Sequence, residues 1–231
     1  MKLFLRILGY LMYFPLCALF VYELIWIAIS VYGHYPVYLW FGIGMGAYVV
    51  LGLFFKKNRK WLQTFSHELT HTLVSMLYLR KIHSFTAERG EGVMSYTPSR
   101  YNIGAVMISL SPYFLPIFTI FLLLIRHMIS GESVHIFDTF VGFTFAFHLG
   151  CFLSQTGSYQ TDLQKHGLFF SYLVIATWLT LNISLVLLSI QSNLFPAIGD
   201  YFPKAWGDLV QCVTFLWEWV REWISSFGAG V

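Results

Sequence analysis

Charged side chains are scarce in this sequence. Asp, Glu, Lys and Arg make up 11% of its 231 residues, whereas hydrophobic residues make up 57%. A soluble domain carries roughly a quarter charged residues, because its surface has to face water. The shortage of charge, together with long apolar runs, excludes an ordinary soluble domain and predicts an integral, multi-pass protein of a cell membrane. The lipid bilayer is therefore its expected main partner.

Cysteine is also sparse, and no two cysteines have CxxC spacing. Cys17, Cys151 and Cys212 lie within or beside apolar segments. An odd number of scattered cysteines gives no disulfide framework and no cysteine-based zinc site. The net charge of +3 comes from short basic clusters between apolar runs. Such clusters are typical of loops that flank membrane spans, so we expect no nucleic-acid partner.

The apolar runs predict an all-α fold, a polytopic bundle of about six transmembrane helices. Each run is near the length of about 20 residues that a helix needs to cross a bilayer. Prolines in the fourth run, Pro112 and Pro116, are expected to kink it. The six runs cover residues 3–31, 37–55, 61–80, 103–126, 137–156 and 168–190.

Two segments depart from this pattern. Residues 82–87 and 93–97 predict short strands, and the glycine-containing stretch between them predicts a turn, so a β-hairpin is expected here. Its open edge either lies in solvent or pairs with an extended peptide. After Pro203, residues 206–227 combine an apolar stripe, four tryptophans and interspersed charges. This pattern predicts an amphipathic helix in the membrane interface.

The third apolar run contains the motif His67-Glu68-Leu69-Thr70-His71. On a helix, residues i and i+4 share one face, so both imidazoles can reach one metal ion. Glu68 lies beside them, where a carboxylate can act as the general base for an attacking water. Ionisable groups in lipid are costly unless they are paired or ligated. The residue types and their spacing therefore predict a Zn²⁺ site that hydrolyses peptide bonds.

A catalytic zinc site needs a third protein ligand and keeps one position open. Glu91 follows His71 by 20 positions, the separation used by soluble zinc enzymes that have a downstream glutamate ligand. His148, inside the fifth run, is a second candidate. Asp162 is a third, in a polar stretch broken by glycine that can re-enter the bundle. We favour Asp162, because two spans cross and return between His71 and Asp162, which places both at one side of the membrane.

The order of these features resembles the site-2 protease family of intramembrane zinc metalloproteases. In that family an HExxH helix is followed by a β-hairpin, a helix that opens with a small residue and proline, another helix, and an aspartate ligand. The matching elements here are the motif His67–His71, the hairpin 82–97, Ser111-Pro112, the fifth run and Asp162.

The resemblance covers roughly residues 61–170 and implies a catalytic membrane core there, preceded by N-terminal transmembrane helices over 1–60 and followed by a C-terminal part over 171–231. It implies that His67, His71 and Asp162 bind zinc and that Glu68 is the base. It also implies a membrane-embedded substrate that is cut within the bilayer.

The chain departs from the family pattern at several positions, so it would be a divergent and minimal member. Ser111-Pro112 replaces the usual Gly-Pro, and Asp162 lacks the usual Asn-Pro and Leu-Asp-Gly surroundings. The asparagine that positions substrate has no counterpart. Ser154 and Gln155 are the candidates for that role, and His148 is a further candidate for substrate contact.

An alternative hypothesis is that the protein binds a metal ion at this site but does not hydrolyse peptide bonds. A membrane scaffold, sensor or transporter component can bind a metal ion through the same residues. Such a protein has little use for an acid beside its ligands, whereas a hydrolase needs its base. Glu68 is therefore the residue that distinguishes the two hypotheses.

Overall fold

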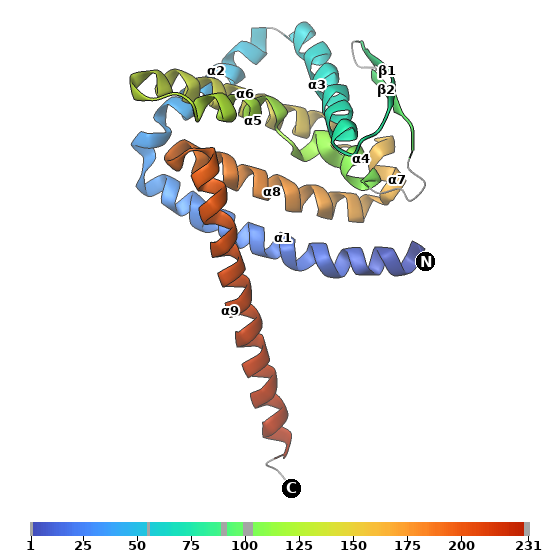
Figure 1. Cartoon of the computed structure of the whole chain (residues 1–231), viewed down its shortest axis with the longest axis vertical. Helices are drawn as coiled ribbons and strands as arrows, with labels where there is room; N and C mark the ends of the chain where they lie inside the picture. Colours follow the sequence, from blue (N-terminus) through green and yellow to red (C-terminus); the bar gives the residue numbers. More distant parts are fainter. Residues whose placement is uncertain (1, 55, 89–91, 99–103, 229–231) are drawn as a thin grey trace.

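The computed structural model describes residues 2–54, 56–88, 92–98 and 104–228 of the chain. Within these ranges the protein is a helical bundle with one two-stranded sheet (Figure 1). In chain order the elements are α1 (Lys2–Gly33), η1 (Tyr35–Tyr38), α2 (Leu39–Phe54), α3 (Lys56–Leu77), β1 (Ile82–Ala87), β2 (Gly92–Tyr96), α4 (Ala105–Phe114), α5 (Ile117–Arg126), η2 (Gly131–Ser133), α6 (Val134–Gln155), α7 (Thr161–His166), α8 (Leu168–Ser192) and α9 (Leu194–Gly228).

Several helices have the length and apolarity of membrane spans, as the composition predicts. In the described part of the chain, four helical stretches are long and apolar enough to cross a bilayer. The α4–α5 pair makes a fifth if its two bent halves count as one span. This architecture fits a multi-pass membrane protein. The four stretches are Ile7–Gly33, Tyr35–Phe54, Gly131–Gln155 and Leu168–Ser192.

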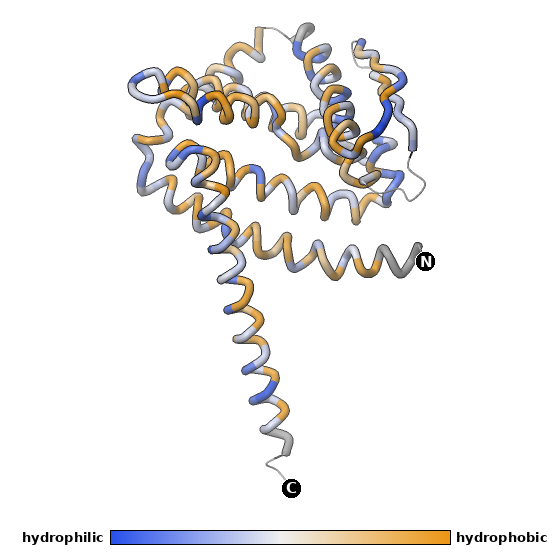
Figure 2. The backbone as a smooth tube through the Cα atoms, viewed as in Figure 1, coloured by the Kyte–Doolittle hydropathy of each residue, from blue (hydrophilic) through white to orange (hydrophobic). Residues whose placement is uncertain are grey.

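The expectation of about six spans is met only in part, because the helix with the HExxH motif is not among these stretches. α3 begins in a basic segment, and Gln63, Ser66 and the motif itself add further polar side chains. Figure 2 shows hydrophilic residues along α3 among hydrophobic ones. In Figure 1, α3 also runs across the direction of α1, α6 and α8. Its polar composition and its direction both distinguish it from those helices.

The expected kink in the fourth run is confirmed at Pro116, whereas α4 continues through Pro112. The axes of α4 and α5 differ by 74°. Pro112 lies inside α4, and the break falls at Leu115 and Pro116, between the two helices. The β-hairpin is also confirmed, with β1 and β2 antiparallel and Phe85 opposite Met94.

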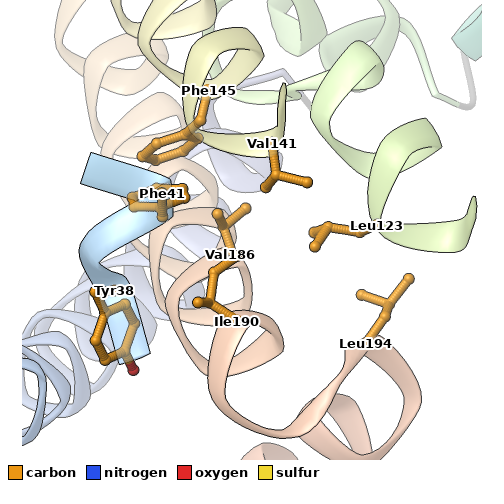
Figure 3. Close-up of a cluster of buried hydrophobic side chains, with 8 residues drawn as sticks. All are labelled: Tyr38, Phe41, Leu123, Val141, Phe145, Val186, Ile190 and Leu194. Carbon is orange, nitrogen blue, oxygen red and sulfur yellow. The ribbon is translucent and has the colours of Figure 1, made fainter. Parts of the chain in front are cut away.

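Glycines allow α2 and α6 to pack at close range. A Cβ atom on Gly44 would lie 1.9 Å from the carbonyl oxygen of Thr139, and one on Gly142 would lie 2.0 Å from that of Phe41. Any side chain at either position would force the helices apart. Beside this contact a cluster of buried apolar side chains joins η1, α2, α5, α6, α8 and the start of α9 (Figure 3). Its members are Tyr38, Phe41, Leu123, Val141, Phe145, Val186, Ile190 and Leu194.

Buried charges join the helix ends around the C-terminus of α8. Arg126, at the end of α5, forms an ion pair with Asp138 of α6, and both side chains are buried. The same guanidinium donates to the carbonyl oxygens of Ser189 and Ile190 and to the side chain of Asn193. These acceptors lie in the last turn of α8 and just after it, where carbonyls run out of helical donors, although the Ser189 carbonyl also accepts from the N–H of Asn193. Arg126 therefore both pairs a charge and caps a helix.

α4 passes through the interior of the protein. All its residues from Ile108 to Phe114 are buried, as expected for a helix that is covered on every side. It contacts α3, α6, α7 and α8. Because α4 contacts both α3 and α7, it positions the two elements that carry the candidate metal ligands.

Candidate metal centre

The HExxH motif lies on the face of α3 that meets α4. His67 and His71 are one helical turn apart, and their ring centroids are separated by 4.7 Å with the planes nearly perpendicular. Tyr113 of α4 packs against the His67 ring at 5.3 Å, also edge to face. His71 is buried and His67 is half-buried. The helix therefore presents both imidazoles to one protected point, as the spacing predicts.

Asp162 approaches the two histidines from α7. Its Oδ2 lies 3.7 Å from Nε2 of His67 and 3.2 Å from Nε2 of His71. The three ligand atoms all lie within 4.8 Å of one another, and among the described residues they form the one group suited to a metal ion. Leu163 anchors the short helix, because its fully buried side chain packs with α4 and α8. Its carbonyl also accepts a hydrogen bond from Ser171 Oγ at 2.9 Å.

The charge balance of the group favours an ionised carboxylate. Burial alone would raise the pKa of Asp162, but the neighbouring imidazoles of His67 and His71 outweigh it and hold that pKa well below its usual value. A carboxylate that stays ionised between two imidazoles is a suitable partner for a cation. Its place in the first turn of α7 adds the favourable end of the helix dipole.

The His71 ring is oriented from its other side. Its Nδ1 lies 2.7 Å from the carbonyl oxygen of Ile108 in α4. A carbonyl oxygen only accepts, so Nδ1 carries a proton, and Nε2, the nitrogen that faces Asp162, is the atom left to bind a metal ion. Such an outer hydrogen bond is usual for metal-binding histidines. The corresponding Nδ1 of His67 is buried and has no hydrogen-bond partner in the described part of the chain.

Glu68 is buried at the bottom of a cavity of about 390 Å³ that also reaches His67. Strand β2 borders this cavity through Gly92 and Val93. A Cβ atom on Gly92 would lie 2.6 Å from Cγ and 2.7 Å from Oε1 of Glu68, so the strand backbone rests on the carboxylate. Trp61 fixes the hairpin to α3 by donating from Nε1 to the carbonyl of Ala87.

The remaining candidates have different positions. Gln155 lines the cavity, whereas Ser154 is exposed and donates to the carbonyl of Cys151 in its own helix. His148 is not part of the ligand group; it is buried and bonds to the backbone of Phe114. Glu91 lies outside the described residues.

Some residues at the site were not singled out by the sequence. Gln160 and Thr64 line the cavity, and Tyr113 contacts His67. Gln160 and Thr64 are close in sequence to Asp162 and the motif, and this proximity was a usable signal. Tyr113 had no comparable signal, because only the packing of α4 on α3 brings it to the site.

The donor set fits zinc. Two imidazole nitrogens and one carboxylate oxygen are a usual ligand set of catalytic zinc, which leaves a fourth position for water or substrate. Glu68 lies next to that group and faces a cavity, as a general base has to. Compared with models of protein families, with curated proteins and with solved structures, the chain has no significant match. The likeness to site-2 proteases therefore stays a prediction from the motifs.

Proposed function

We propose that this chain is a membrane-embedded zinc endopeptidase. One observation carries the proposal: His67, His71 and Asp162 bring three ligand atoms together beside the buried carboxylate of Glu68. The two histidines come from one helix and the aspartate from an element more than 90 residues later. A purely structural histidine pair needs neither a third ligand nor an adjacent acid.

The residues divide the chemistry between them. His67, His71 and Asp162 hold the ion, and bound there Zn²⁺ supplies a Lewis acid that polarises a carbonyl and acidifies water. Glu68 accepts the proton of the attacking water and delivers it to the leaving amine. The cavity beside Glu68 receives the peptide, and Gln155 and Gln160 offer amide groups that can hydrogen-bond to the peptide backbone.

The substrate in this proposal is a membrane-embedded peptide held in an extended conformation. A helical peptide bond is hydrogen-bonded and shielded, so the substrate has to unwind before it is cut. Among the described residues β2 pairs with β1 alone. Gly92 and Val93 of β2 border the cavity, and the edge of β2 that faces away from β1 offers backbone groups to an added strand.

The site lies at one end of the bundle. α6 ends at Gln155, α8 begins at Leu168, and α7 with Asp162 lies between them. The peptide bond that is cut would accordingly lie near the membrane face at which these helices end. Substrates with a flexible segment at that depth are the class that this arrangement favours.

The C-terminal helix completes the proposed membrane arrangement. α9 leaves the bundle and runs across the direction of α1, α6 and α8 (Figure 1). A helix perpendicular to membrane spans runs parallel to the plane of the membrane. Exposed tryptophans along α9 suit the interface between lipid and water. These are Trp206, Trp217, Trp219 and Trp223.

The Glu68→Gln variant tests the proposed function. The full chain, purified in detergent, is assayed for bound zinc and for cleavage of a panel of single-span fusion proteins. We expect the variant to keep its zinc and to lose at least about a hundredfold in cleavage rate, because it has lost its base. If the variant cleaved substrates at the wild-type rate, the proposal that the protein is a zinc protease would be refuted. Zinc binding without cleavage by either protein would favour the metal-binding scaffold, sensor or transporter component.

A further inference from the structure

Pro112 stands inside α4, four residues after Ile108. In an α-helix the N–H of residue i donates to the carbonyl of residue i−4, and proline has no N–H. The carbonyl oxygen of Ile108 therefore has no helical donor. An orphaned acceptor in a buried segment is costly unless another group satisfies it.

Two side chains supply that oxygen with donors. His71 Nδ1 donates to it across the interface between α3 and α4 at 2.7 Å. Ser111 Oγ donates to it from the next turn of the same helix at 3.1 Å. Ile108, Ser111 and His71 are all buried. The proline thus creates an acceptor at the point where a candidate metal ligand needs one.

Pro112 does not cause the bend between α4 and α5. α4 continues as far as Phe114, and the 74° turn toward α5 falls at Leu115 and Pro116. Pro112 lies before that break, within an unbroken helix. Its distinct local consequence is the free carbonyl oxygen of Ile108.

We propose that Pro112 is a positioning residue of the metal centre, which reserves the Ile108 carbonyl for the Nδ1–H of His71. This inference rests on the metal-binding part of the proposed function. The hydrogen bond holds the Nδ1 proton and the rotation of the ring in place, so Nε2 faces the metal position and lies 3.2 Å from Asp162 Oδ2. Within the described residues, Nδ1 of His67 has no equivalent hydrogen bond. The orientation of His71 is therefore the part of the site that α4 controls.

The first experiment measures Zn²⁺ affinity by competition with a chromophoric chelator, on the full chain in detergent. Pro112→Ala supplies an N–H that competes for the Ile108 carbonyl, and we expect affinity to fall at least about tenfold, the usual effect of losing an outer-shell partner. Pro15→Ala is the matched control, since Pro15 lies inside α1 and is exposed. Wild-type affinity in Pro112→Ala would overturn the proposal, and so would an equal loss in Pro15→Ala.

A second measurement does not depend on metal. In protein labelled with ¹⁵N at histidine and freed of metal, the Nδ1–H proton of wild-type His71 should exchange slowly with solvent; its signal is identified as the one that His71→Gln removes. In Pro112→Ala this proton should exchange much faster, whereas in Ser111→Ala it should stay protected, because His71 then becomes the sole donor to that oxygen. An equally protected Nδ1–H in Pro112→Ala would refute the inference. A wild-type chain with this protected proton but no zinc affinity would refute the proposed function instead.

Discussion

The backbone of Gly92 rests on the side chain of Glu68, so closely that a Cβ atom there would lie 2.6 Å from Glu68 Cγ. Strand β2 and the candidate base therefore share one wall of the cavity. Contacts below 3.0 Å cannot be accommodated unless one partner moves. The hairpin is consequently more than a solvent loop next to the site, since its backbone determines where the carboxylate can lie.

Substitution of Gly92 by valine is expected to impair cleavage and spare the metal. The added side chain pushes Glu68 from its place, and a displacement of about 1 Å at a reacting group can cost about a hundredfold in rate. None of the three ligands is touched, so zinc content should stay at the wild-type value. The measurement is kcat on a reporter together with zinc content. Gly42→Val is the control, because a Cβ there meets nothing within 4 Å; equal kcat in both variants would contradict the contact.

Removal of the third ligand tests the geometry of the centre. Asp162→Ala should lose zinc, as should His67→Ala and His71→Ala, because two ligands alone hold the ion weakly. Glu91→Ala should keep its zinc if Asp162 is the ligand. Metal content after purification and dialysis decides between them. Zinc retained in Asp162→Ala and lost in Glu91→Ala would transfer the role to Glu91.

The free edge of β2 can be tested with proline. Backbone N–H groups along a strand point alternately to its two neighbours, so proline at Val93 and proline at Met94 each remove one of the two kinds. The variant that loses an N–H on the free edge should have a higher KM for the substrate, and it should keep both its zinc and its hairpin. The other should weaken the pairing with β1. If neither variant changes cleavage, extended substrate does not pair with this edge.

The buried ion pair between Arg126 and Asp138 predicts a change in stability without a change at the metal. Asp138→Leu leaves a buried guanidinium without its counter-charge, which costs about 3–5 kcal/mol in the free energy of unfolding. The midpoint of thermal unfolding in detergent should fall clearly while zinc content stays constant. Asp208→Leu serves as control, since Asp208 is more exposed and its partner Lys204 also pairs with Glu23. An unchanged midpoint in Asp138→Leu would show that carbonyl capping alone satisfies Arg126.

Local patterns in the sequence were enough to predict much of the architecture. Apolar length predicted the long helices, and the i, i+4 spacing predicted that His67 and His71 share a face. The choice of Asp162 came from counting the crossings between it and the motif, and the structure places it within reach of both histidines. These inferences need only helix geometry and chain order.

The remainder depends on contacts between distant segments. The carbonyl of Ile108 is 37 residues from His71, and nothing local in the sequence marks it as an acceptor. The contact of the Gly92 backbone with the Glu68 side chain, and the hydrogen bonds from Arg126 to the end of α8, also join segments that are far apart in the sequence. For α3, apolar residues were given more weight than the polar ones between them, and the helix does not reach the hydropathy of a span. The polar residues of α3 include the two candidate metal ligands His67 and His71 and residues that line the cavity, Thr64 and Glu68.

Metal removal gives the last prediction. Dialysis of the purified chain against a chelator should abolish cleavage, and stoichiometric Zn²⁺ should restore it, because the ligands persist without the ion. Zinc affinity should fall as pH is lowered, since protons compete for Nε2 of His67 and His71. The pKa of Asp162 lies well below its usual value, so its carboxylate does not compete for protons in the range where histidines titrate. Zinc affinity measured between pH 5 and 8, a range centred near about 6.5 for an ordinary histidine, should therefore fall steeply toward the acid end, and a flat profile would exclude imidazole ligands.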